Sequence, residues 1–359
     1  MVVMDIERTR EEPGGIPWSD RGPAPAAVLS PDHARRPAPD LVPITSGRDA
    51  PEWMPLAGTA LLERLRHTGR PRLHPDPCLV DRLREWLEQA AGPELPGVPL
   101  VVTRERLTQA LACESHATDS QFAQRPPTVA LACGALMGAL FRQLVTVGSI
   151  DDPMADGLAA LSVDDRQDDL VSWIAHLAAP ERDELAGEVE RQADGLRRRW
   201  PSLEPAWLPR THQSLRAALV GGAVELSARV DLAIGRPLPH KASVALVEVK
   251  SGARRPEHRD DRHFDALVEA VRSPAPPFVV ATYYTRTGEL DVDPVSAELL
   301  VESARRTAVG ISRMRQLAEG APSRPGDRCS WCALQTDRHP DEQPLCSPGL
   351  GCSPPVGDR

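Results

Sequence analysis

The chain has 359 residues, of which 41% are apolar and 4% aromatic, and its formal net charge is −9. This is enough apolar sequence for the core of one large or two modest domains. No apolar run reaches the length expected to span a bilayer, and residues 1–15 are acidic and polar where a secretory signal is basic and then apolar. These features exclude the membrane and secreted classes and favour a cytoplasmic protein.

The predicted organisation has four parts. Residues 1–50 hold eight prolines without an apolar period, which predicts a disordered arm. Residues 51–100 contain two predicted helices, 56–67 and 78–89, and form a small helical preface. The main domain is expected over 101–346, mostly helical up to residue 199 and then with a sheet over about 213–285. The Gly- and Pro-rich residues 347–359 are expected to be a flexible tail.

Alternating apolar and polar residues predict the strands of the main domain. The stretches 214–219 and 223–234 have strand periodicity, and Gly221-Gly222 between them is a two-residue hairpin signal. A third strand is predicted over 243–250, followed by a helix over 259–272 and a strand over 277–285. An amphipathic helix over 294–319 follows the last strand. The order of elements predicts an α/β domain.

Three charged residues in this region form a candidate metal site. Asp231 lies near the end of the second strand, and Glu248 and Lys250 occupy alternate positions of the third, so the latter two point to one face. Lys250 is one of two lysines against forty arginines, and a lysine ammonium is compact with a pKa that its surroundings can shift. Carboxylate ligands suit Mg²⁺ or Mn²⁺, which take part of their shell from substrate phosphate. The alternative is an ordinary strand that ends in a surface Glu and Lys.

Asp231, the segment Glu248-Val-Lys250-Ser-Gly252 and the helix and strand after it resemble the RecB-like and AddB-like branch of the PD-(D/E)xK nuclease superfamily, over about residues 103–346. The resemblance implies a restriction-endonuclease-like core, which is a small mixed sheet flanked by helices. It also implies that Asp231, Glu248 and the carbonyl of Val249 bind the catalytic Mg²⁺ or Mn²⁺. Lys250 would then assist attack on a DNA phosphodiester.

The cysteines are a second point of resemblance. Cys329-Ser-Trp-Cys332 and Cys346, with Cys113 upstream of the core, resemble the family's iron-sulfur ligands, and four thiolates are enough for a [4Fe-4S] cluster. Cys352 could replace Cys346. The alternatives are a zinc site formed by Cys329, Cys332, Cys346 and Cys352, or no metal at all.

The sequence departs from the family at two places. The family has a histidine on a helix before the sheet, where this chain has Met137 and Gly138. His176 on the next helix is either a substitute for it or a surface or capping residue. On the helix after the third strand, Asp261 and Asp265 stand where the family has Gln and Tyr, and they either ligate a metal or repel DNA. These departures leave open a catalytically inactive protein on the same fold.

The distribution of charge bears on DNA binding. A net charge of −9 is unfavourable for phosphate contacts, but residues 191–262 hold fourteen Lys and Arg against eight Asp and Glu. Arg254 and Arg255 directly follow the proposed catalytic strand and are expected to bind DNA; a solvated charged face is the alternative. The chain has no Walker motif, so any unwinding would need a helicase partner.

These patterns favour a metal-dependent DNA nuclease, an exonuclease directed to single strands or ends, in a process such as DNA repair or recombination. No base-reading module is recognisable, so contacts are expected with the DNA backbone, ends or structure. The alternatives are a catalytically inactive DNA-binding or scaffold protein on the same fold and a zinc-stabilised interaction protein.

Overall fold

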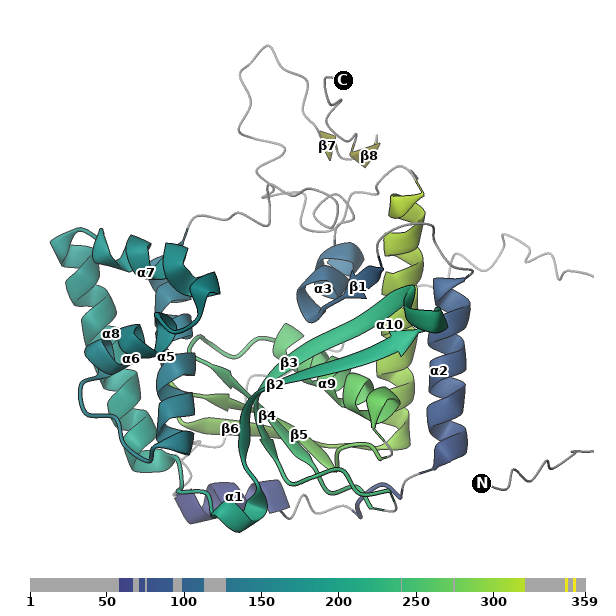
Figure 1. Cartoon of the computed structure of the whole chain (residues 1–359), viewed down its shortest axis with the longest axis horizontal. Coiled ribbons are helices and arrows are strands. Elements are labelled where there is room, and N and C mark those ends of the chain that lie inside the picture. The colour runs from purple at the N-terminus through teal and green to yellow at the C-terminus, as the bar shows by residue number, and fades with distance from the viewer. Residues whose placement is uncertain are drawn as a thin grey trace, which may run out of the picture. The chain divides into compact units, whose positions relative to one another are not determined.

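The computed structural model describes residues 58–66, 71–74, 76–92, 99–112, 127–239, 241–273, 275–319, 346–347 and 351–352. The expected arm over 1–50 and most of the expected tail over 347–359 lie outside these ranges, so both stay predictions. The main described part is a mixed sheet between two layers of helices (Figure 1).

The two longest strands form the predicted hairpin. β2 (Arg210–Leu219) and β3 (Val224–Ile234) pair antiparallel along their length. The turn η5 (Val220–Gly222) between them has Gly221 at φ 63° and Gly222 at φ 99°, which glycine adopts without the steric cost of a Cβ. The hairpin indicated by the two glycines is therefore confirmed.

Four further strands complete the sheet. β1 (Leu100–Val102) runs parallel to β3, and β4 (Ala245–Lys250) runs antiparallel to β3. β5 (Val279–Tyr284) is parallel to β4, and β6 (Glu289–Pro294) is antiparallel to β5. The parallel connection from β4 to β5 is made by α9 (Glu257–Arg272). The strand order is β1-β3-β4-β5-β6 with β2 also on β3, and the predicted restriction-endonuclease-like core is confirmed.

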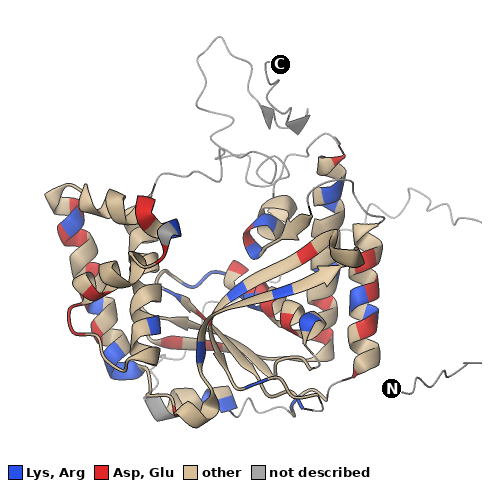
Figure 2. Cartoon of the chain, viewed as in Figure 1, with Lys and Arg blue, Asp and Glu red and all other residues tan. Residues whose placement is uncertain are grey.

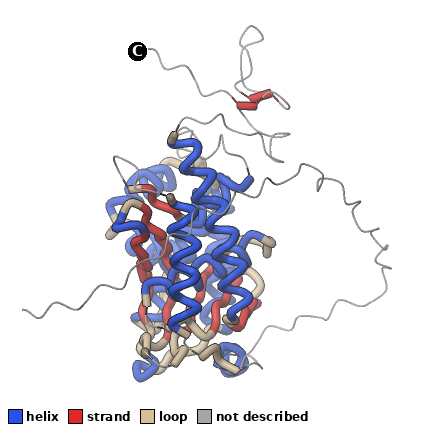
Figure 3. Tube along the Cα trace, turned by 90° about the vertical axis from the view of Figure 1, so that its right-hand side faces the viewer, coloured by secondary structure: helices blue, strands red, loops and turns tan. Residues whose placement is uncertain are grey.

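One face of the sheet is covered by α2 (Pro77–Ala91), α3 (Arg104–Ala112), α9 and α10 (Ala297–Ala318). α2 and α10 lie side by side (Figure 3). Leu79, Leu83 and Leu87 recur every four residues along α2 and are buried in the core that α9 and α10 share. The division between a preface and a main domain at residue 100 stays a prediction.

The opposite face is covered by α1 (Gly58–Arg66), α5 (Val129–Thr146), α6 (Pro153–Leu161), α7 (Asp168–Ala175) and α8 (Ala179–Arg199), with the short turns η3 (Asp165–Gln167) and η4 (Pro205–Trp207). Trp200 anchors this side, because its ring makes edge-to-face contacts with Phe141 (4.7 Å) and Tyr283 (4.9 Å). A second hydrophobic core therefore ties the α5–α8 layer to the sheet.

Among the described residues, one helix, α5, is long and apolar enough to cross a membrane by length and composition alone. The expectation that no apolar run reaches this length is wrong. Seven residues of α5 are buried, and the helix packs against α6, α8, β2 and β4. A helix enclosed on several sides in a core is apolar around much of its circumference, which explains its composition.

Candidate active site

The candidate site lies where β3 and β4 separate. Leu232 and Val247 are the last paired residues of the two strands on this side. Beyond them the carboxylate of Asp231 takes the place of a backbone acceptor, because the amide of Val249 donates to its Oδ2 at 2.7 Å. Asp231 and Glu248 are thus neighbours across the open end of the ladder.

The carboxylate of Glu248 is buried and carries two cations on one oxygen. Lys250 Nζ lies 2.7 Å from Glu248 Oε1, and Arg104 Nη1 binds the same oxygen. Arg104 also lies 3.4 Å from Asp265 Oδ2 and donates to the carbonyl of Arg229 at 3.1 Å. Arg104 begins α3 directly after β1, so the strand that pairs with β3 delivers this guanidinium to the site.

α9 adds two carboxylates. Asp261 and Asp265 are one helical turn apart, which places them on one face of α9. Asp261 Oδ2 lies 3.9 Å from Lys250 Nζ, and Asp265 is fully buried. Glu248 Oε2 and Asp265 Oδ1 are buried oxygens without a hydrogen-bond partner in the described part of the chain. We refer to the following residues as the carboxylate cluster: Asp231, Glu248, Asp261 and Asp265, with the cations Arg104 and Lys250.

Four carboxylates against two cations leave an excess of negative charge that appears in the pKa values. Burial and the charge of Glu248 raise the pKa of Asp231 and raise that of Asp261 to about 6. Burial raises the pKa of Asp265 well above its ordinary value despite the adjacent Arg104. Burial also opposes ionisation of Glu248, but the two cations hold its pKa below the ordinary value. Full ionisation of the cluster therefore requires additional positive charge.

The donor atoms fit an open Mg²⁺ or Mn²⁺ site. Asp231 and Glu248 supply carboxylate oxygens at the end of the sheet, and Glu248 Oε2 is buried without a partner among the described residues. Mg²⁺ sites commonly use one or two protein carboxylates and complete their shell with water and phosphate. Within the described ranges no group of three or more His, Cys, Asp and Glu side chains could enclose a metal ion. Asp231 and Glu248 would therefore fill only part of the shell of such an ion.

α5 passes the end of β4 without a histidine. A Cβ on Gly134 would lie 3.3 Å from Ser251 Oγ, while a Cβ on Gly138 would meet no atom within 4 Å. Met137 is fully buried. His176 ends α7, is exposed, and places its Nδ1 2.7 Å from a backbone carbonyl one turn earlier. His176 is therefore a capping residue, as one of its two readings predicted.

A pair that the sequence did not indicate, Arg142 and His212, lies beside the cluster. His212 is in β2 at φ 52°, which is rare for a residue with a Cβ, and its Nε2 contacts Nη1 of Arg142. The pairing of Thr211 with Leu232 places His212 next to Asp231. Burial and the charge of Arg142 lower the pKa of His212 to about 4, so its imidazole is neutral at pH 7. Backbone strain of this kind is concentrated at functional sites.

Arg254 and Arg255 follow β4 in the loop before α9. Arg254 Nε pairs with Asp291 Oδ2 at 2.8 Å, and Arg255 is exposed. Elsewhere, arginines are interspersed with Asp and Glu along α2 and α8, and α8 ends in three consecutive arginines (Figure 2). DNA binding by Arg254 and Arg255 stays a prediction.

Most of the expected cluster cysteines, Cys113, Cys329 and Cys332, lie outside the described residues. The backbones of Cys346 and Cys352 lie opposite each other in a two-stranded ladder formed by β7 (Cys346–Ser347) and β8 (Gly351–Cys352). The iron-sulfur and zinc readings both stay predictions.

Comparison with known proteins found a structural likeness only. No family model and no curated protein matches the chain. A solved structure from Eubacterium rectale, provisionally named an exonuclease, is 12% identical to this chain and aligns with a TM-score of 0.43. The alignment covers 68% of this chain and 90% of that chain.

Proposed function

We propose that the protein is a Mg²⁺- or Mn²⁺-dependent DNA nuclease that uses Asp231, Glu248 and Lys250. One observation carries this proposal. Asp231 and Glu248 are neighbours at the separated ends of β3 and β4, and Lys250 Nζ lies 2.7 Å from Glu248 Oε1. Two carboxylates and an ammonium at one end of a sheet can hold a divalent cation and stabilise the charge that develops during hydrolysis of a phosphodiester.

Each residue has a role that its position supports. Asp231, Glu248 and the carbonyl of Val249 would hold the divalent cation. When bound, such a cation lowers the pKa of a coordinated water and offsets charge on the phosphate. Lys250 would orient the attacking water or stabilise the charge that develops on the phosphate oxygens. Burial and the charge of Glu248 raise the pKa values of Asp231 and Asp261, and a bound cation would oppose both effects, which supports this proposal.

The proposed substrate is DNA, as single strands or ends. Arg254 and Arg255 would contact its backbone, and a helicase partner would supply unwound strands. Cys113, Cys329, Cys332 and Cys346 would hold a [4Fe-4S] cluster, with zinc as the alternative metal. This activity would serve DNA repair or recombination in the cytoplasm. Metal analysis of anaerobically purified protein distinguishes iron from zinc.

A second candidate is a catalytically inactive DNA-binding or scaffold protein, and one contact favours it. Arg104 binds Glu248 and lies close to Asp265, so a guanidinium supplies positive charge where an active site would use a metal ion. In this case Arg104 would offset the charge of Glu248 and Asp265 without a metal. Titration calorimetry with Mn²⁺ tests this by comparing the wild type with Asp231→Asn. If the site is inactive, the two proteins should bind Mn²⁺ equally or not at all.

Cleavage of end-labelled single-stranded DNA in the presence of Mn²⁺ tests the enzyme. Wild type should cut, and Lys250→Ala should lose most of the activity. Lys241→Ala is the matched control, because Lys241 is the other lysine of the chain and is exposed. Equal activity of wild type and Lys250→Ala would remove Lys250 from the mechanism. No cleavage by wild type, together with no Mn²⁺ binding, would support the inactive protein.

A further inference from the structure

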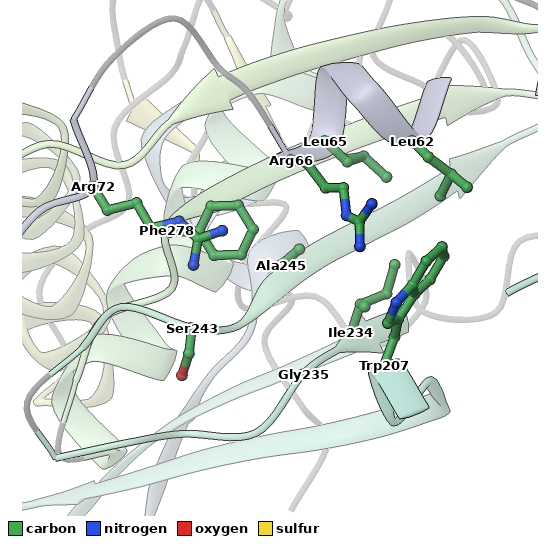
Figure 4. A pocket seen from close by; sticks show the side chains of 10 residues that line it. All are labelled: Leu62, Leu65, Arg66, Arg72, Trp207, Ile234, Gly235, Ser243, Ala245 and Phe278. Carbon is green, nitrogen blue, oxygen red and sulfur yellow. The ribbon is translucent and has the colours of Figure 1, made fainter. Parts of the chain in front are cut away.

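A small cavity lies at the opposite end of β4 from the carboxylate cluster. Its volume is about 190 Å³, and ten residues line it (Figure 4): Leu62, Leu65, Arg66, Arg72, Trp207, Ile234, Gly235, Ser243, Ala245 and Phe278. Ala245 begins β4 and Lys250 ends it, so the cavity is about 17 Å from Lys250 along the strand. Ala245 also points to the opposite face of the sheet from Lys250, since side chains alternate. The cavity is therefore separate from the proposed active site.

Two arginines stacked on aromatic rings mark this cavity. The guanidinium carbon of Arg72 lies 3.7 Å from the centre of the Phe278 ring, and that of Arg66 lies 4.7 Å from the centre of the Trp207 ring (Figure 4). Within the described ranges, Arg72 donates one hydrogen bond, to the carbonyl of Ala242 at 3.2 Å. Neither guanidinium forms an ion pair with a carboxylate of the described residues. Both charges are thus held in place by rings and have unused hydrogen-bond donors.

The walls between the arginines are apolar and rigidly built. Gly235 has φ 93°, and a Cβ there would lie 2.3 Å from the carbonyl oxygen of Ser243, so only glycine allows the two segments to approach. The hydroxyl of Ser243 donates to the carbonyl of Arg236 at 2.6 Å, and the carbonyl of Gly235 accepts from Arg210 at 2.9 Å. Leu208, directly after Trp207, has φ 52° and is 47% exposed. The hydroxyl of Ser243 and the carbonyl of Gly235 are therefore engaged, which leaves the rings and the two guanidiniums as the means of recognition.

We infer that this cavity binds a nucleoside phosphate, with the base stacked between the arginine–ring pairs and the phosphate held by Arg66 and Arg72. The volume is below the roughly 300–1,000 Å³ of drug-sized sites, so the cavity would enclose the base and leave the sugar and phosphate at its mouth, where Arg66 and Arg72 are exposed. Guanidinium planes and aromatic rings stack on bases, and paired guanidiniums bind phosphate through several donors. Recognition by stacking and charge tolerates any base.

The choice of a nucleotide among flat anions rests on the proposed function, because hydrolysis of DNA by an exonuclease releases nucleoside phosphates. The same chemistry is present at the phosphorylated end of a single strand. Binding of deoxyadenosine monophosphate and of a short 5′-phosphorylated deoxyadenosine oligonucleotide separates these two sources.

Titration calorimetry of the full chain in EDTA tests the site without cleavage. Wild type should bind deoxyadenosine monophosphate, the oligonucleotide or both. Arg66→Ala and Arg72→Ala should each weaken binding by about tenfold or more, because a charge-assisted contact is lost. Arg82→Ala is the matched control, since Arg82 is an exposed arginine of α2 outside the cavity. Deoxyadenosine, which lacks the phosphate, should bind about tenfold or more weakly than the monophosphate.

The outcomes separate this inference from the nuclease proposal. Lys250→Ala should bind like wild type even if it no longer cuts DNA. No binding of either ligand by wild type, equal binding of deoxyadenosine, or binding unchanged in both arginine variants would overturn the inference. If an alanine variant unfolds at a lower temperature, Arg72→Lys tests the same point, since it keeps the charge and loses the planar stack. Binding by Arg72→Lys as tight as wild type would overturn the role of stacking, and weaker binding supports it.

Discussion

Replacement of Asp261 by asparagine should stabilise the protein at high pH and have a smaller effect at low pH. Burial and the nearby charge of Glu248 raise the pKa of Asp261 from an ordinary 3.8 to about 6. Between these two pH values the folded state therefore holds a proton on Asp261 that the unfolded state has released. The free energy of unfolding of the wild type falls as the pH rises between these two values, since the folded state binds more protons. Asparagine cannot ionise, so the variant escapes this loss.

The size of the effect follows from the pKa change. At about 1.36 kcal/mol per pKa unit, ionisation of Asp261 costs the folded wild type about 3 kcal/mol well above pH 6. The side chain of Asp261 is only 19% exposed, so solvent screens this cost weakly. The attraction of Lys250 over 3.9 Å is already contained in this net pKa, so it is not subtracted again. We expect a gain of about 3 kcal/mol at about pH 8 and about 1 kcal/mol at about pH 4.5.

Urea unfolding followed by circular dichroism, at both pH values and with EDTA, measures this difference. Asp260→Asn is the matched control, because Asp260 is the preceding residue of α9 and its side chain is 46% exposed. The control should show a smaller dependence on pH. An equal gain for Asp261→Asn at both pH values would show that its surroundings do not hold a proton on Asp261. The reasoning about excess negative charge in the cluster would then be wrong.

Three further predictions address the site and the fold. Arg104→Met should lower the free energy of unfolding by about 3–5 kcal/mol at neutral pH, because it leaves buried Glu248 short of a cation. Urea unfolding with Mn²⁺ present should show part of this lost free energy restored. An unchanged free energy of unfolding would contradict the buried ion pair. Gly138→His should be tolerated within about 1 kcal/mol, since a Cβ there meets open space, and it should tighten Mn²⁺ binding in calorimetry if the site holds the metal; unchanged affinity would place Gly138 outside the metal shell. Gly235→Ala should lower the free energy of unfolding by more than about 1 kcal/mol, because its Cβ would collide with the carbonyl of Ser243, and an unchanged thermal midpoint would refute that close approach.

The sequence by itself determines four of the six strands of the main sheet, their hairpin and the three residues proposed for catalysis, but not β1 and β6. Alternation of apolar and polar residues and the glycine pair at the turn are local signals, since each depends on residues a few positions apart. The predicted helix over 259–272 corresponds to α9 (Glu257–Arg272) for the same reason. Asp231, Glu248 and Lys250 lie on neighbouring strands joined by one short connection, so strand pairing alone brings them together.

Only the tertiary structure decided which cations and carboxylates complete the cluster. Arg104 reaches Glu248 across 144 residues of sequence, and Arg142 reaches His212 across 70. The cavity likewise joins α1, η4 and the strand ends through Arg66, Trp207 and Phe278. A buried charge is stabilised by whichever opposite charge packs near it in space, and no periodicity along the chain encodes that partner.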